Sequence, residues 1–568
     1  MPIKIERRSR KCDAAFENEI GDFCALLGAK FVRTACCAAQ VRSDQRDASM
    51  QLTSMLRRAA QINAHGLAIV DGTTRSSWGA FVARVARVAG GLVALGLRRG
   101  ERVAILAVNH ASFLELQYAV VWAGGVIVPV NTRLSVSEIG TIVGAASVSM
   151  LAADPQFESV VREVAQRAPG LRNVIWFSGS EAIGAQPYAW LAEQHAIEDR
   201  SEGGMDRPVG IYFTGGTTGR PKGAMLSQAN FVCQAAAMQS ALELRSDSVY
   251  LHATPLFHLA DCGIGHAITF AAGGHSFLAR FEPAACLEKI LEDQVTEVNL
   301  VPTMLAALLG AVEHGSHRAV AALAAVRTVA YGGAPIPAPL LHQLIARLPN
   351  AKFRQFYGMT ETCGACASLA PEWHTPDADA TRQRSAGQAM PFAELKIVAP
   401  DGSERLRGEA GEVAIRGPQI MLGYWQDPKS TSLAVRDGWM FSGDIGVMDE
   451  HGFVRIVERL KDMIISGGEN IYSGEVENAI AVHPAVVACA VIGLPDPRWG
   501  ERVHAIVVTR PDAREAALQH DLEVHCRGLI AGYKCPKSWD FRATALPLSS
   551  LGKINKAQLR EEAFGDAN

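Results

Sequence analysis

The sequence predicts an α/β protein in which a large N-terminal region with a mostly parallel sheet precedes a small α+β region. Three observations predict this fold. Short continuous apolar runs, typical of buried parallel strands, alternate with segments of helical periodicity. After residue 437 the pattern changes to turn-rich sequence and then to further short strands. Hydrophobic residues make up 48% and charged residues 20% of the chain, so it has enough apolar surface to fold around a core.

Helices are indicated at three places in the first part of this pattern. Met50 opens an apolar segment that is a plausible helix start. Ser135 and Glu138 have the spacing of a capping box, so a second helix should begin after Ser135. A third helix is indicated by apolar residues that recur at steps of four and three and therefore share one face: Phe81, Val85, Val88, Leu92 and Leu95.

Strands are expected between these helices, at the apolar runs 103–106 and 126–130. Strands that alternate with helices form βαβ units, which produce a mostly parallel sheet with helices on both faces.

The same patterns divide the chain into three parts. Residues 1–49 lack strand–helix alternation, so we expect an N-terminal extension that is loosely attached or disordered, and truncation at Met50 should leave activity intact. Residues 50–459 would form the large domain. Residues 460–568 would form the small domain, with strands at 486–492 and 503–508 and two helices between and beyond them.

Composition excludes several classes of protein. There are 55 Lys+Arg and 58 Asp+Glu, a net charge of −3, which argues against a nucleic-acid binder. The longest apolar stretch, 118–130, is shorter than the roughly 20 residues that a membrane-spanning helix needs. Most of the 12 cysteines stand alone, which favours reduced thiols in the cytoplasm over a disulfide framework.

The most informative motif runs from Tyr212 to Gly223. Its glycines allow backbone N–H groups to approach oxygen atoms closely, its threonines add hydroxyl donors, and Lys222 adds positive charge, so the run suits a loop that wraps polyphosphate. It lacks the spacing of a Walker A loop. Composition alone would also allow a flexible surface loop.

Further motifs follow in order: Tyr331-Gly332-Gly333-Ala334-Pro335, Tyr357-Gly358-Met359-Thr360-Glu361-Thr362, Ser442-Gly443-Asp444, Glu458-Arg459-Leu460-Lys461-Asp462, Ser466 to Tyr472, and Gly552-Lys553. Together with the glycine-rich run they resemble the signatures of the acyl-adenylate-forming superfamily, most of all its fatty-acid and other acyl-CoA synthetases. The resemblance covers residue 50 to the end. Gly215 is a departure, since the family usually has serine there.

The resemblance implies a large multi-sheet adenylation domain followed by a small mobile α+β domain. It implies an AMP-forming acid–thiol ligase that uses ATP, Mg²⁺ and CoA, first forming an acyl-AMP and then a CoA thioester. It also implies that these residues contact ATP: Thr214, Gly215, Gly216, Thr217, Thr218, Gly219, Lys222, Gly332, Gly333, Ala334, Pro335, Tyr357, Gly358, Met359, Thr360, Glu361, Asp444, Arg459 and Lys553.

The resemblance also implies roles for individual residues. Tyr357 would stack on adenine, and Asp444 would accept hydrogen bonds from the ribose hydroxyls, with Arg459 reaching the sugar or the phosphates. Glu361 would bind Mg²⁺, while Thr217 and Thr360 would bond phosphate oxygens. Taken singly, these residues have ordinary structural explanations, such as a core aromatic, a surface salt bridge or a helix-terminal acid.

Lys553 is implied as the central cation of the first step, which brings the carboxylate of the acid and the α-phosphate of ATP together. Lys461 would be the pivot about which the small domain turns before the thiol step. His258, Gly332 and Gly364 would line the acyl pocket. CoA would pass Gly467, Gly468 and Trp499.

The acid itself is predicted less sharply. Small residues after the Glu361 motif, including Gly364, resemble those of fatty-acyl enzymes, so a medium- or long-chain fatty acid is expected, with an aryl acid as the alternative. An enzyme that loads a carrier protein and an inactive nucleotide-binding relative are further alternatives. Peripheral membrane contact and oligomeric state stay open.

Overall fold

The computed structural model describes residues 50–178, 186–201, 204, 206–214, 221–313, 317–334, 336–459, 462–466, 469–510, 515–548 and 554–565. The expected N-terminal extension, 1–49, lies outside these residues.

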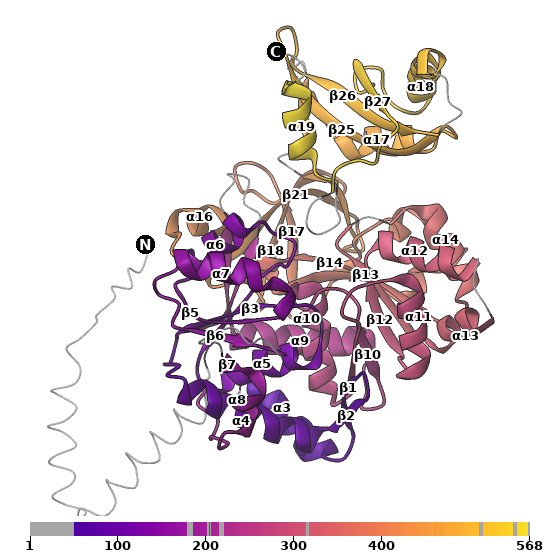
Figure 1. The fold of residues 1–568 in the computed structure, drawn as a ribbon. Helices are drawn as coiled ribbons and strands as arrows, with labels where there is room; N and C mark the ends of the chain where they lie inside the picture. Colours follow the sequence, from indigo (N-terminus) through magenta and orange to yellow (C-terminus); the bar gives the residue numbers. More distant parts are fainter. Residues whose placement is uncertain are drawn as a thin grey trace, which may run out of the picture.

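The larger of two central sheets joins segments from both ends of the large N-terminal part (Figure 1). All its neighbours from β14 to β1 are parallel, in agreement with the mostly parallel sheet that the sequence predicted. Nine strands of the described chain form it, in the order β16 (Gln388–Ala389), β15 (Gly364–Leu369), β14 (Lys352–Met359), β13 (Thr328–Gly332), β12 (Glu297–Leu300), β10 (Val249–His252), β11 (Gly274–Phe277), β1 (Leu67–Asp71) and β2 (Thr74–Ser77).

The second central sheet contains both apolar runs that the sequence analysis assigned to strands. They form β3 and β4, which pair in parallel and are buried on both faces, as that pattern requires. Within the described residues its order is β19 (Gly423–Tyr424), β9 (Lys222–Ser227), β8 (Pro208–Thr214), β4 (Val126–Pro129), β3 (Arg102–Leu106), β5 (Val148–Ala153), β6 (Asn173–Trp176) and β7 (Gln186–Pro187).

Helices fill the space between these sheets and cover their outer faces (Figure 1). The inner layer contains α3 (Leu52–Asn63), α4 (Trp78–Ala94), α5 (Ala111–Trp122), α8 (Tyr188–Glu193), α9 (Gln228–Leu242) and α10 (Leu259–Ala271). Outside the second sheet lie α6 (Val136–Ala145) and α7 (Glu158–Arg167). Outside the first lie α11 (Pro283–Glu292), α12 (Pro302–Glu313), α13 (His317–Ala325) and α14 (Ala338–Arg347).

The two helix predictions that rest on a pattern are confirmed. Phe81, Val85, Val88 and Leu92 of α4 are all buried, so the predicted apolar face is the one that packs into the core. The capping box at the start of α6 is present: the Ser135 hydroxyl accepts from the Glu138 N–H, and the Glu138 carboxylate accepts from the Ser135 N–H.

A third sheet lies beside the central pair and ends the large part of the chain. Its strands are β17 (Glu394–Val398), β18 (Ala410–Arg416), β21 (Trp439–Met448) and β20 (Val435–Arg436), and β22 (Val454–Arg459) pairs with β21. The short helices α15 (Ala380–Gln383) and α16 (Pro428–Ala434) accompany it.

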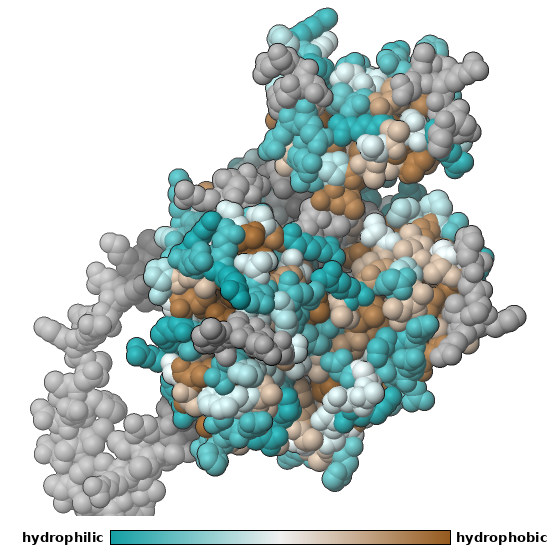
Figure 2. All heavy atoms as spheres, in the orientation of Figure 1, coloured by the Kyte–Doolittle hydropathy of each residue, from teal (hydrophilic) through white to brown (hydrophobic). Residues whose placement is uncertain are grey.

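The C-terminal residues form a small domain with its own sheet and core, seen as a separate lobe in Figures 1 and 2. Its described strands are β24 (Glu469–Ile471), β23 (Ile464–Ser466), β26 (Gly500–Thr509), β25 (Val486–Asp496) and β27 (Ser538–Arg542). Its helices are α17 (Ser473–Ala481), α18 (Glu515–Leu529) and α19 (Lys556–Gly565). The α/β class with a large multi-sheet domain and a small α+β domain is therefore confirmed.

One local prediction in this domain is wrong. We expected a helix between the strands at 486–492 and 503–508, but β25 and β26 are longer and form an antiparallel hairpin. The Asp496 side chain accepts hydrogen bonds from the N–H groups of Arg498 and Trp499 at 2.9 and 3.0 Å. This local turn closes the hairpin and leaves no length of chain for a helix.

In the part of the chain that the structure describes, no helix is long and apolar enough to cross a membrane.

Candidate active site

The predicted adenine-binding segment ends β13, next to the aromatic motif that ends β14. Gly332 is the register partner of Phe356 in these parallel strands. A Cβ atom on Gly332 would lie 2.5 Å from the Phe356 carbonyl oxygen, so only glycine fits there. Gly333 follows with φ +78°, a left-handed conformation that glycine adopts without strain. The sequence therefore bends the chain away at the carboxyl end of the sheet, with Ala334 beyond the bend.

The Tyr357–Thr362 motif occupies the end of β14 and a short turn before β15. Met359 pairs with Gly364 across this antiparallel connection, and the Thr362 hydroxyl donates to the Gly364 carbonyl at 2.6 Å. Gly358 packs so closely that a Cβ atom on it would lie 1.9 Å from the same carbonyl oxygen. The predicted nucleotide motif and the predicted acyl-pocket glycine, Gly364, are therefore neighbours.

Gly358→Ala is expected to weaken this connection. The added methyl must push β14 and β15 apart, and overpacking of this kind typically costs about 1–3 kcal/mol. We expect a lower melting temperature and slower acid activation, measured by thermal unfolding and pyrophosphate release. Gly144→Ala is the matched control, because a Cβ atom there meets nothing within 4 Å. It should leave acid activation unchanged and keep or raise the melting temperature, since alanine favours the helix α6 more than glycine does. Equal melting temperatures for the two variants would contradict the packing argument.

The predicted adenine and ribose residues are joined by a hydrogen bond. The Tyr357 hydroxyl donates to Asp444 Oδ2 at 2.8 Å, and Asp444 is 4% exposed. Burial and then the neighbouring Asp444 carboxylate raise the pKa of Tyr357 well above its usual value, so the phenol remains a neutral donor at physiological pH. Asp444 is also the register partner of Arg459 in β21 and β22, which places the predicted Asp–Arg couple on adjacent strands.

Tyr424 connects the predicted metal ligand to the lysine of the glycine-rich run. Its hydroxyl donates to Glu361 Oε1 at 2.8 Å, and Lys222 Nζ lies 5.2 Å from the centroid of its ring. Burial, followed by the Glu361 carboxylate, raises the pKa of Tyr424, so this hydroxyl also stays protonated. Strand β19 holds Tyr424 here by pairing with Ala224 of β9. Thr214 and Lys222, the ends of the predicted phosphate loop, face each other across β8 and β9.

The carboxylate of Glu361 fits a magnesium ion that arrives with ATP. Among the described residues, no three or more His, Cys, Asp or Glu side chains gather as a metal cage. Mg²⁺ commonly takes one or two carboxylates together with substrate phosphates, and the carboxylate of Glu361 matches that donor set. Tyr424 occupies only Oε1 of Glu361.

Two of the three predicted acyl residues, His258 and Gly364, lie where α9, α10 and β15 meet, whereas Gly332 lies at the end of β13. His258 precedes α10, and its Nδ1 accepts a hydrogen bond from the Ala260 N–H at 3.1 Å. The ring thus caps the helix, which supports a positional role. A Cβ atom on Gly364 would lie 3.7 Å from the Leu259 carbonyl oxygen, so Gly364 is at the start of the same helix.

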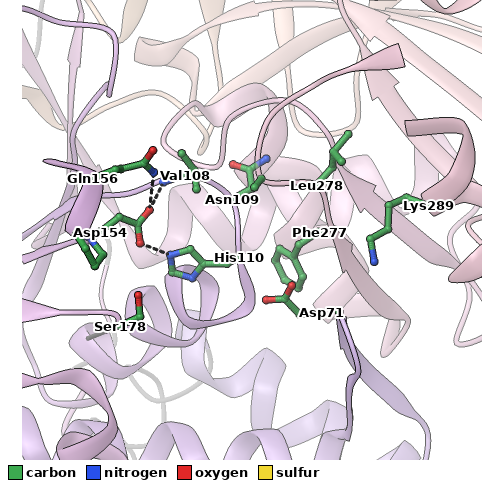
Figure 3. Close-up of a pocket in the computed structure, with 13 residues that line it drawn as sticks. Asp71, Val108, Asn109, His110, Asp154, Gln156, Ser178, Phe277, Leu278 and Lys289 are labelled. Atoms are coloured by element: carbon green, nitrogen blue, oxygen red, sulfur yellow. Dashed lines mark hydrogen bonds and ion pairs between the residues drawn. The ribbon is translucent and has the colours of Figure 1, made fainter. Parts of the chain in front are cut away.

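A separate cavity of about 560 Å³ opens between β1, β3 and β11 (Figure 3). None of the predicted site residues lines it. Its acidic groups are already engaged: Asp154 accepts from the Val108 N–H and pairs with His110, and Asp71 accepts from the Ala111 N–H. Both carboxylates thus stabilise loop and helix ends, so their presence in this cavity has a structural explanation.

Among the residues predicted in the small domain, the structure describes Trp499. Trp499 lies in the β25–β26 turn and is 44% exposed, with the Arg498 guanidinium 4.6 Å from its ring centroid. Leu548 and Ile554 form an antiparallel bridge on either side of the lysine motif.

Ten predicted site residues lie outside the described part of the chain: Gly215, Gly216, Thr217, Thr218, Gly219, Pro335, Lys461, Gly467, Gly468 and Lys553.

Sequence reasoning missed Tyr424 and the partner of Glu458. Glu458 lies near the end of β22, and its carboxylate accepts hydrogen bonds from the Ser473 hydroxyl and, at 2.9 Å, from the Gly474 N–H, both in α17. Neither contact has a local sequence signal, because the bonded residues lie 63 and 15 positions apart in the sequence.

Sequence comparison places this α/β protein in a family. Residues 56–425 match the model of the AMP-binding enzyme family, and residues 475–553 match that of the AMP-binding enzyme C-terminal domain. The chain belongs to the AMP-binding enzyme family, among its acyl- and aryl-CoA ligases. This confirms the family predicted from the motifs.

Individual relatives agree with this assignment. The chain is 38% identical to a feruloyl-CoA synthase of Amycolatopsis sp over 89% of its own length and 98% of the relative's. It is 34% identical to the long-chain-fatty-acid–CoA ligase FadD13 of Mycobacterium tuberculosis, over 89% and 97%. Among solved structures, ATP-bound MatB from Rhodopseudomonas palustris is similar with a TM-score of 0.78 and 31% identity, over 90% and 99% of the two chains.

Proposed function

We propose that this enzyme activates a carboxylic acid with ATP and transfers the acyl group to CoA. The acid and ATP form an acyl-AMP and pyrophosphate, and the CoA thiol then displaces AMP to form the thioester. The observation that carries the proposal is the convergence of Lys222, Tyr424 and Glu361 beside the Tyr357–Asp444 pair. A cation, a carboxylate and a sugar-binding acid at one sheet edge suit a nucleotide with its phosphates.

The first step must overcome repulsion between two anions, the carboxylate and the α-phosphate. Lys222 would neutralise phosphate charge, and Lys553 would lie between the reacting oxygens. Glu361 would hold the Mg²⁺, which when bound neutralises phosphate charge. Thr217 and Thr360 would donate hydroxyl hydrogen bonds to phosphate oxygens, and Asp444 would fix the ribose. Since an acid with a pKa near 4 is already ionised at neutral pH, no general base is needed.

The thiol step requires a second arrangement of the same site. We assign the large domain to residues 50–459 and the small domain to 460–568, with Lys461 as the pivot between them. Turning the small domain would carry Lys553 away and bring Gly467, Gly468 and Trp499 toward the path of CoA. The bonds from Glu458 to α17 would have to open or reform in that motion.

For the acid we propose an aryl acid of the substituted cinnamate type. Support comes from the 38% identity with a feruloyl-CoA synthase, to which the chain aligns over 98% of that relative. A medium- or long-chain fatty acid is the second candidate. It is favoured by Gly364, which leaves room at the acyl pocket, and by the similarity to a long-chain fatty-acid ligase.

The proposal is tested by incubating the purified enzyme with ATP, Mg²⁺, CoA and a panel of cinnamic and straight-chain acids. We expect AMP, pyrophosphate and thioester to form in equal amounts, and fastest with the cinnamic acids. AMP and pyrophosphate without thioester would contradict the CoA step. No acid-dependent AMP with any member of the panel would contradict the function as a whole.

A further inference from the structure

In the described core of the large domain, three glutamines have an Nε2 donor without a hydrogen-bond partner, Gln117, Gln234 and Gln419, and of these Gln234 lies beside the predicted acyl-pocket residue Gly364. Gln234 lies in α9 and is 3% exposed, and its Nε2 makes no hydrogen bond. Buried amide donors are nearly always paired, because an unpaired one loses its bonds to water and gains none in return. An exception therefore needs an explanation.

The position of Gln234 supplies one. The Cβ position of Gly364 lies 3.4 Å from Gln234 Nε2 and 3.8 Å from its amide carbon. Gly364 pairs with Met359 of the predicted nucleotide motif, so the Gln234 amide lies beside the connection between that motif and β15. An acid whose carboxylate meets ATP and whose tail passes Gly364 would run along the Gln234 amide.

Another glutamine of the same helix shows what a structural amide looks like here. Gln239 Nε2 donates to the Leu244 carbonyl at 2.8 Å and ties down the end of α9. Gln234 Nε2 makes no comparable hydrogen bond to the described residues. Its donor is free to serve a bound molecule.

We propose that Gln234 selects acids whose aromatic ring carries an oxygen substituent, by donating a hydrogen bond from Nε2 to a phenol or ether oxygen. This inference rests on the proposed function and names the residue that recognises the substituent on the ring of the acid. A ring with a methyl or ethyl group in the same place leaves the donor unpaired. A site built around a polar partner rejects an isostere that lacks it.

The test compares acids of equal size. The 4-hydroxy and 4-methyl cinnamates form one pair, and the 3-methoxy and 3-ethyl cinnamates form the other. We expect the wild-type enzyme to favour the oxygen-bearing member of at least one pair on the order of tenfold in kcat/KM, measured by pyrophosphate release. In Gln234→Leu this preference should fall to within about twofold of unity, mainly by loss with the oxygen-bearing acid.

Stability provides an independent readout. Replacing an unpaired buried amide by an apolar side chain of similar size should leave the melting temperature unchanged or raise it. Gln239→Leu, the matched control, should lower the melting temperature and keep the substrate preference. If Gln234→Leu does not fold, Gln234→Glu is tested instead. The Glu carboxylate has no N–H donor, so activity with the 3-methoxy acid in particular should fall.

Three results would overturn the inference: equal use of both members of each pair by the wild type, retention of the preference in Gln234→Leu, or a fall in its melting temperature like that of Gln239→Leu. A wild-type enzyme that uses only straight-chain acids would also overturn it while leaving acid activation intact. A wild-type enzyme that forms no AMP with any acid fails the proposed function itself.

Discussion

Lys553→Ala is expected to slow acyl-AMP formation a few hundredfold, the largest single effect we predict. The reason is electrostatic: without this ammonium group the carboxylate and the α-phosphate must approach without a cation between them. Loss of one preorganised group that stabilises developing charge costs about 3–4 kcal/mol, which is a factor of a few hundred in rate. The measurement is a single-turnover assay of acyl-AMP with saturating ATP and acid.

A nearby lysine supplies the control. Lys537 lies in the same domain, and its Nζ donates to the Gly532 carbonyl at 3.2 Å. Lys537→Ala should adenylate within about twofold of the wild type, since an exposed lysine of this kind contributes little. If Lys553→Ala also stays within twofold, the charge of Lys553 is not what lets the two anions meet.

Lys461→Pro is expected to abolish thioester formation while acyl-AMP formation continues. Strand β22 ends at Arg459 in one sheet and β23 begins at Ile464 in another, so the joint between the domains is a few residues long. Asp462 already belongs to the small domain, where Arg560 donates to it at 3.0 Å. Proline fixes φ near −65° and would prevent the rotation that admits CoA.

The readout is a ratio of two rates, acyl-AMP formation without CoA and thioester formation with it. We expect the first to change by less than about threefold and the second to fall by about a hundredfold or more, because the pivot serves only the second step. Lys461→Ala keeps the backbone free and should retain both steps. Equal losses in both rates for Lys461→Pro would contradict the pivot role.

Local patterns were sufficient to predict those elements whose cause is local. The α4 face follows from spacing within one helix, and the start of α6 follows from a capping box four residues long. Strands β3 and β4 follow from apolar runs, which burial on both faces requires. The glycines Gly332 and Gly358 of two motifs also have a local cause, because neighbouring backbone atoms lie too close for a side chain there.

Contacts between distant segments could not be predicted in this way. Tyr424 meets Glu361 over 63 positions of sequence, and Gln234 faces Gly364 across two layers of the fold. The β25–β26 hairpin was missed because Asp496 closes the turn through its side chain, a feature that apolar periodicity does not register. Tertiary packing decides each of these.

The account rests on acid activation by an adenylating site, and isotope exchange tests it most directly. With labelled pyrophosphate, ATP, Mg²⁺ and a cinnamic acid but no CoA, the enzyme should return label to ATP at a rate that depends on the acid, because acyl-AMP formation is reversible. Exchange at the same rate with and without the acid would contradict the account, and so would the absence of exchange with any acid while thioester still forms.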